Sequence, residues 1–250
     1  MTDNLGLIIA TVLFLVALAI VFFVKRRASA RRQTVLIVGL SDAGKSVIFA
    51  RLVGGNLVKT VTSMQENATH TEFEGQKLQL VDVPGAANVR AARLQHWLRE
   101  NHGAVKGVIF VIDSCTFQRQ QRDVAELLYD LLISVPKGVP LLVTCNKQDQ
   151  PLAKSAQTIE SVLEKELAML CGTRQASLES TEGDGDTAMK RRSLAEPGQK
   201  FTWEDFDKVE VEFIECNAIG SVVEEADAAA EEEDEEEYDL SGIEQWLMEL

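Results

Sequence analysis

The sequence contains few of the residues from which zinc centres and histidine-dependent catalytic sites are built. Among 250 residues there are only four cysteines and three histidines. The histidines are scattered without a recognisable catalytic neighbour, and the cysteines lack the spacing of a metal site. We expect the cysteines to be buried, reduced thiols, as is usual in the cytosol. They are Cys115, Cys145, Cys171 and Cys216.

Positive charge is also scarce. The chain has 25 lysines and arginines against 39 aspartates and glutamates, which gives a net charge of −14. Nucleic-acid binding depends on cations that neutralise phosphates, so this balance argues against a direct nucleic-acid partner. Part of the excess is the acidic run Glu231–Glu237, inside the segment 221–238. Such a run is typical of a solvated, disordered loop, and a docking site for a basic partner is the alternative.

Charged residues are absent between Leu5 and Val24. At about 1.5 Å per residue, a helix of this length crosses the roughly 30 Å hydrocarbon core of a bilayer. A cleaved signal peptide is the alternative, but the stretch is too long for a signal core and the basic cluster follows it. That cluster suits lipid head groups and orients the helix with positive charge in the cytosol. We therefore expect a short lumenal N-terminus, a transmembrane helix, a basic linker and a cytosolic domain at 1–4, 5–24, 25–33 and 34–250.

Phosphate-binding signals, by contrast, are present. Residues 39–46 read GLSDAGKS, which fits the phosphate-loop pattern G-x-x-x-x-G-K-[ST]. An apolar strand-like run precedes them and a helix-like segment follows. In this context backbone N–H groups surround phosphate oxygens, the lysine neutralises them and the serine binds Mg²⁺. The predicted nucleotide contacts here are Gly39, Leu40, Ser41, Asp42, Ala43, Gly44, Lys45, Ser46 and Val47.

A second motif selects the base. Asn146-Lys147-Gln148-Asp149 follows the apolar run Leu141–Cys145. The Asp149 carboxylate can accept hydrogen bonds from N1–H and the exocyclic amine of guanine, a pair that adenine does not offer. The stem of Lys147 can lie along the base plane, and Asn146 can tie this loop to the phosphate loop. Together the two motifs predict a site for GTP or GDP.

Two shorter signals complete the predicted site. Asp82 and Gly85 form a D-x-x-G motif, which places a carboxylate near Mg²⁺ through water and a glycine N–H near the γ-phosphate. Ala218 follows a later strand, and its N–H is expected to face the guanine oxygen. This last signal is weak on its own.

Strand-like and helix-like segments alternate along the rest of the chain. Alternation of this kind predicts a three-layer α/β fold with a mostly parallel six-stranded sheet, in which all these motifs lie at the carboxyl ends of strands. The segment 172–200 is predicted to be a flexible insertion. A capping box, with Ser241 and Glu244, is predicted to open the last helix. The expected strands lie near 34–38, 68–73, 77–82, 107–113, 140–146 and 209–216, and the expected helices near 46–53, 88–101, 117–134, 155–171 and 242–250.

The combination resembles the β subunits of the signal recognition particle receptor, which are Arf/Sar-like small GTPases with one N-terminal membrane span in the endoplasmic reticulum. The nucleotide motifs would fit any small GTPase. The membrane span and the last third of the chain point to this family. The segments that carry the resemblance are the span, GLSDAGKS, Thr60–Ser63, NKQD followed by Lys154–Ala156 and Glu164–Leu167, Thr173-Arg174, Val211–Cys216 and Ile243–Leu247.

The resemblance implies a P-loop small-GTPase fold, a partner and further site residues. The GTP-bound family members hold the N-terminal domain of the receptor α subunit, and so help indirectly to bring ribosomes to the translocon. Ser63 is the implied switch hydroxyl on Mg²⁺, with Thr62 beside it and Thr60 as the alternative. Ala86 stands where many small GTPases have a water-orienting glutamine, so we expect slow hydrolysis. The alternative function is that of a membrane-anchored Arf/Sar-like GTPase in vesicle traffic.

Overall fold

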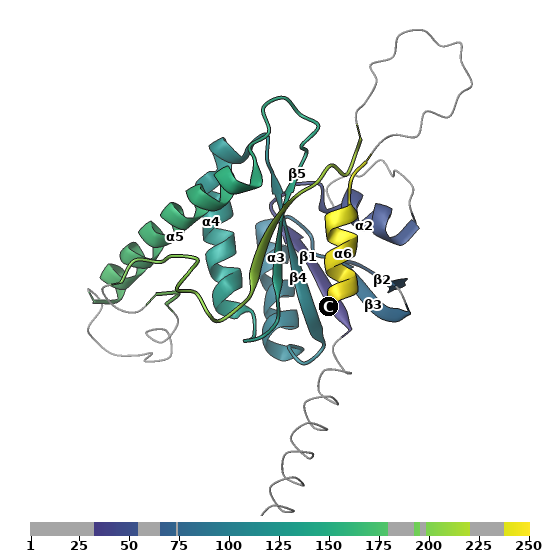
Figure 1. Ribbon diagram of the computed structural model, residues 1–250. Coiled ribbons are helices and arrows are strands. Elements are labelled where there is room, and N and C mark those ends of the chain that lie inside the picture. The colour runs from purple at the N-terminus through teal and green to yellow at the C-terminus, as the bar shows by residue number, and fades with distance from the viewer. Residues whose placement is uncertain (1–32, 55–65, 74, 180–192, 196–198, 221–237) are drawn as a thin grey trace, which may run out of the picture.

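The structure, a computed structural model, describes residues 33–54, 66–73, 75–179, 193–195, 199–220 and 238–250. Helices and strands alternate as the sequence predicts (Figure 1). Every predicted strand is present, with its ends within two residues of those expected. The elements are β1 (Thr34–Gly39), α2 (Lys45–Gly54), β2 (Asn67–Phe73), β3 (Gln76–Asp82), α3 (Ala87–Gln95), a π-helical turn (His96–Glu100), β4 (Val105–Asp113), α4 (Phe117–Ser134), β5 (Leu141–Asn146), α5 (Ala156–Glu179), β6 (Val211–Glu215) and α6 (Ser241–Glu249).

The six strands form one sheet in the order β2-β3-β1-β4-β5-β6. All neighbouring pairs are parallel except the hairpin of β2 and β3 at one edge. Strands β1 and β5 are buried along their whole length, which explains why they read as continuous apolar runs in the sequence. The edge strand β2 has no buried residue, and its side chains alternate between exposed and half-buried.

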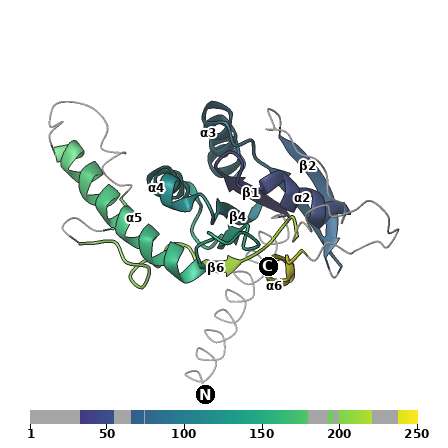
Figure 2. The same cartoon turned by 90° about the horizontal axis from the view of Figure 1, so that it is seen from above.

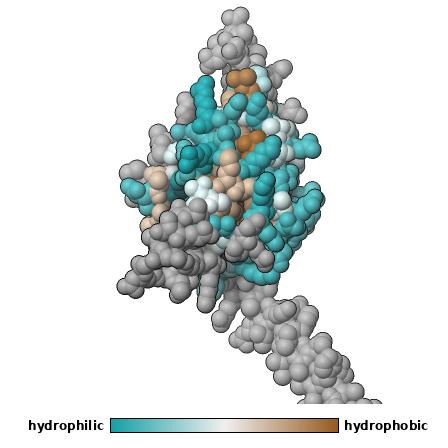
Figure 3. Space-filling model, turned by 90° about the vertical axis from the view of Figure 1, so that its left-hand side faces the viewer, coloured by the Kyte–Doolittle hydropathy of each residue, from teal (hydrophilic) through white to brown (hydrophobic). Residues whose placement is uncertain are grey.

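Helices cover both faces of the sheet and give the predicted three layers (Figures 1 and 2). Alternate residues of β1 point to opposite sides, so that Leu36 and Val38 pack with α4 and α5 while Val35 and Ile37 pack with α2 and α6. On α6 the face toward the sheet is apolar, and Ile243, Trp246 and Leu247 are buried there. The face of α4 and α5 that Figure 3 shows is mostly hydrophilic, with separate apolar patches.

Helix α5 is longer than the sequence predicts. It continues to Glu179, past the expected end at residue 171 and into the segment expected to be a flexible insertion. Gly172 lies inside it, but one exposed glycine costs a helix only about 1 kcal/mol. Arg174 offsets this cost, since its guanidinium pairs with Asp130 at 2.7 Å and lies over the Tyr129 ring, 4.2 Å from the ring centroid. These contacts with α4 hold the last turns of the helix in place.

The predicted capping box at Ser241 is not formed. The N-cap of α6 is Leu240, and no side chain caps it. Instead, Asp239 Oδ1 accepts hydrogen bonds from the Ser241 N–H at 3.0 Å and from the Ser241 hydroxyl at 2.6 Å. The carboxylate that precedes the helix therefore binds the serine that was expected to cap it, and the helix begins one residue earlier than predicted.

Several predictions fall outside the described residues. They are the transmembrane helix at 5–24 with its flanks, most of the acidic segment 221–238, and the insertion at 180–192 and 196–198. Among the described helices, none combines the length and apolar character that crossing a bilayer requires.

Candidate guanine-nucleotide site

The phosphate loop connects β1 to α2 and contains two glycines that its geometry requires. A Cβ on Gly39 would lie 2.3 Å from the Val111 carbonyl oxygen. Gly44 has a φ of +95°, and its Cβ would lie 2.2 Å from Asn146 Nδ2. No other residue fits either position. The loop thus lies directly against the ends of β4 and β5.

Lys45, Ser46 and Asp82 meet where α2 begins and β3 ends. Lys45 Nζ donates to the Leu40 carbonyl at 2.6 Å, and the Ser46 hydroxyl donates to Asp82 Oδ2 at 2.6 Å. Within the described residues, Asp82 Oδ1 is buried without a hydrogen-bond partner. A free carboxylate oxygen beside a hydroxyl is the oxygen-rich setting that Mg²⁺ prefers. These residues therefore fit the predicted metal site.

Burial shifts the pKa values of both charged groups. It lowers the pKa of Lys45 to about 8, although Asp82 opposes the shift. It raises the pKa of Asp82, although the Ser46 hydroxyl and Lys45 oppose it. A buried ammonium that has lost much of its hydration interacts strongly with an added anion. The pair can accordingly hold a phosphate group and a divalent cation.

The D-x-x-G segment lies on the phosphate loop. A Cβ on Gly85 would be 2.8 Å from Ser41 Cα, so only a glycine allows this approach. The Arg90 guanidinium, in the first turn of α3, donates to the Gly85 carbonyl and fixes the backbone of the D-x-x-G segment. Ala86 is the N-cap of α3 and offers only a methyl group. Its side chain cannot hold a water molecule, as the sequence predicts.

Asn146 joins the base loop to the phosphate loop. Its Nδ2 donates to the Ala43 carbonyl at 2.9 Å, which confirms the predicted link between the loops. Its Oδ1 accepts from the Ala218 N–H at 3.1 Å. Ala218 therefore lies at the predicted place, but its N–H is bound to Asn146 in this structure. Its contact with the guanine oxygen remains a prediction.

The other two base-reading residues are held by neighbours that no motif marked. Asp149 Oδ2 accepts from Gln150 Nε2 at 2.7 Å. Lys147 Nζ forms a 2.7 Å ion pair with Asp113 Oδ2 at the end of β4. The sequence signal for Asp113 is a carboxylate at the end of a buried strand, the position that Asp82 has on β3. Asp82 was recognised by its D-x-x-G motif, whereas Asp113 belongs to none of the motifs described above and its role was therefore missed.

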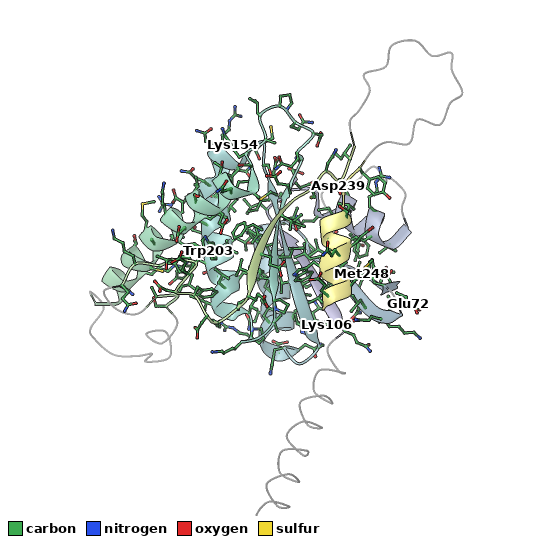
Figure 4. The ribbon with its side chains drawn as sticks, in the orientation of Figure 1. Glu72, Lys106, Lys154, Trp203, Asp239 and Met248 are labelled. Carbon is green, nitrogen blue, oxygen red and sulfur yellow. The ribbon has the colours of Figure 1, made fainter. Side chains whose placement is uncertain are left out.

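The site residues collect at one end of the strands. Lys154 and Asp239 lie toward this end in Figure 4, and Lys106 and Glu72 lie toward the opposite end. It is the end formed by the carboxyl ends of the parallel strands. Thr60, Thr62 and Ser63, the predicted switch hydroxyls, lie outside the described residues.

Comparison with known proteins identifies the family. Residues 30–211 match the family described as signal recognition particle receptor beta subunit. The chain belongs to this family. It is 36% identical to signal recognition particle receptor subunit beta of Mus musculus over 256 aligned residues, 99% of this chain and 88% of the mouse protein. ADP-ribosylation factor-like protein 2 of Drosophila melanogaster is 32% identical, but the similarity covers 57% of this chain and 74% of that protein.

Two solved structures support the same assignment. The mammalian SRP receptor superposes with a TM-score of 0.68 at 33% identity, covering 87% of this chain and 99% of that one. The SRb-GTP/SRX complex from Chaetomium thermophilum gives a TM-score of 0.56 at 26% identity, with 76% of this chain and 92% of that one covered. The small-GTPase-like α/β fold and the family membership thus agree with the sequence-based predictions.

Proposed function

We propose that this chain is the GTP-binding, membrane-anchored subunit of a signal recognition particle receptor, and that its GTP state holds the receptor α subunit at the endoplasmic reticulum membrane. The main support is that similarity to the β subunits of mouse and human extends over 99–100% of the chain, whereas similarity to the Arf-like proteins covers 56–57% of it. Vesicle traffic, the alternative function, does not account for the additional shared length.

The nucleotide is GTP or GDP with Mg²⁺. The loop around Gly44 and Lys45 receives the phosphates, because it leads directly into the N-terminus of α2, and helix N-termini favour anions. Ser46 and Asp82 supply oxygen atoms for the metal, and Ser63 is the proposed switch ligand. Asp149 reads the base. When bound, the metal neutralises the β- and γ-phosphate oxygens.

The proposed partner is the N-terminal domain of the receptor α subunit. The Chaetomium complex, which contains SRb, GTP and SRX, supports a GTP-dependent contact by its similarity to this chain. Ribosomes and the translocon would be reached only through this partner. The apolar stretch 5–24 is the proposed anchor, with the GTPase domain in the cytosol.

The test is purification of the full-length protein from detergent-extracted membranes, followed by identification of its bound nucleotide and partners. We expect guanine nucleotide and a receptor α subunit, both retained by the wild type. The variant Lys45→Met should lose both, whereas Lys137→Met, a matched change at an exposed lysine, should retain both. Recovery of vesicle-coat proteins in place of the α subunit would contradict the proposal.

A further inference from the structure

Asp113 contacts the base loop and the start of a helix at the same time. Its Oδ1 accepts hydrogen bonds from the N–H groups of Cys115 at 2.9 Å and Thr116 at 3.1 Å. Its Oδ2 forms the 2.7 Å ion pair with Lys147 Nζ. The two oxygens thus have separate tasks. One supports the turn into α4, and the other binds a residue of the guanine-recognition motif.

The backbone of Lys147 explains why such a partner is needed. Its φ is +68°, a left-handed conformation that is costly for a residue with a Cβ. A conformation of this kind persists only when surrounding contacts fix it. The lysine side chain is also long and flexible, so without a partner its ammonium would sample many positions. The ion pair with Asp113 restricts both the ammonium and the stem that leads to it.

The residue next to Asp113 supports the same loop from the backbone. The Ser114 N–H donates to the Asn146 carbonyl at 3.0 Å, and its own carbonyl accepts from the Lys154 N–H at 3.1 Å. Its hydroxyl accepts from Gln148 Nε2 at 3.1 Å. The end of β4 is therefore bonded to the base loop at its beginning, its middle and its end.

We propose that Asp113 is a positioning residue of the guanine site, which holds Lys147 so that its aliphatic stem covers one face of the base. The inference rests on the guanine-nucleotide site proposed above. Asp113 does not touch the nucleotide and acts through Lys147. Its removal should weaken binding of the base and leave binding of the phosphates unchanged, because the phosphate loop is formed by other residues.

Two substitutions separate the two tasks of Asp113. Asp113→Asn keeps an oxygen for the α4 turn but places an amide opposite the Lys147 ammonium. Lys147→Met keeps an apolar stem and removes the ammonium. Loss of a charged hydrogen bond weakens an interaction by about tenfold or more, and we expect this reduction in GDP affinity for each variant. The double variant should bind GDP no more weakly than the weaker single variant, because both changes remove the same interaction.

The experiment measures GDP affinity of the full-length, detergent-solubilised protein with a fluorescent guanine nucleotide, and inorganic pyrophosphate affinity by competition. Asp130→Asn is the matched control. Asp130 is exposed on α4 and forms an ion pair of the same 2.7 Å length, with Arg174 of α5. It should leave GDP binding unchanged. Asp113→Asn should weaken GDP binding and spare pyrophosphate binding.

Three outcomes would overturn the inference: unchanged GDP affinity in Asp113→Asn, additive losses in the double variant, or an equal loss for GDP and pyrophosphate. The last would show that Asp113 serves the fold in general. A wild-type protein that fails to bind GDP would instead contradict the proposed function, so the two failures can be told apart.

Discussion

Asn146 Nδ2 lies 2.2 Å from the place where the Cβ of a side chain on Gly44 would begin. The two residues are far apart in the sequence, yet the Asn146 amide occupies the space that any side chain on Gly44 would need. Gly44 leaves room for the amide, and the amide reaches past it to the Ala43 carbonyl. The phosphate loop and the base loop are therefore joined by a hydrogen bond within the protein itself.

This link predicts the effect of Asn146→Ala. The change leaves the buried Ala43 carbonyl and Ala218 N–H without their partner, at a cost of about 1–3 kcal/mol in the free energy of unfolding. Denaturant unfolding without nucleotide measures it. The exposed Asn101→Ala variant serves as the control and should change stability little. A loss confined to nucleotide binding, with unfolding unchanged, would show that the link contributes nothing to the fold.

The fold was largely predictable because its central strands are buried on both faces and so stand out as apolar runs between polar loop motifs. The end of α5 was not, since it depends on Arg174 reaching Asp130 and Tyr129 on another helix. Asp113 was missed for a related reason. Its role depends on the ion pair with Lys147, which follows the neighbouring strand β5 and comes within 2.7 Å of Asp113. Sequence spacing does not show that these two residues meet. The prediction that Ser241 caps α6 was wrong, because the Ser241 hydroxyl donates to Asp239 instead.

Base selection gives the second prediction. Asp149→Asn replaces one carboxylate oxygen by an amide donor, so the site should prefer xanthine, which presents a carbonyl where guanine has its amine. We expect GTP affinity to fall by roughly a hundredfold or more and xanthosine triphosphate to bind better than GTP. Competition binding measures both. Gln150→Ala removes only the neighbour that donates to Asp149 and should keep the preference for guanine. Tight ATP binding by the wild type would contradict the assignment of Asp149.

Lys45 predicts a pH dependence of binding. Its pKa is about 8 in this structure, because burial outweighs the attraction of Asp82. Bound phosphates should raise it, so above about pH 8 the complex keeps a proton that the free protein has lost. Binding then takes up a proton, and GDP affinity falls by up to about tenfold per pH unit. Calorimetry between pH 7 and 9.5, in two buffers with different ionisation enthalpies, counts the protons directly. An affinity independent of pH would show that Lys45 stays charged without nucleotide.

The membrane anchor is predicted from the uncharged stretch 5–24 and the basic residues that follow it. The protein should stay in microsomal membranes during alkaline carbonate extraction, and protease added outside should digest the GTPase domain. A variant without residues 1–32 should be released by carbonate while it still binds GDP. A mature N-terminus near Ala30 would instead identify a cleaved signal peptide.

The last prediction concerns what the bound GTP does. Ala86 has no oxygen or nitrogen to orient a water toward the γ-phosphate, while Lys45, Ser46 and Asp82 keep the groups needed to bind the nucleotide and its metal. Loss of a water-orienting group raises the barrier to hydrolysis without lowering affinity. We therefore expect slow single-turnover hydrolysis and capture of the α subunit in the GTP state. Ser46→Asn should abolish capture, because it replaces the hydroxyl proposed to bind the metal with a longer amide and so weakens binding of Mg²⁺ and GTP. Ala86→Gln is the matched variant that leaves the metal site intact, and it should retain capture while its turnover rises or stays the same. Fast hydrolysis by the wild type, or equal capture with GDP, would show that GTP is consumed in a cycle rather than held as a cofactor for assembly.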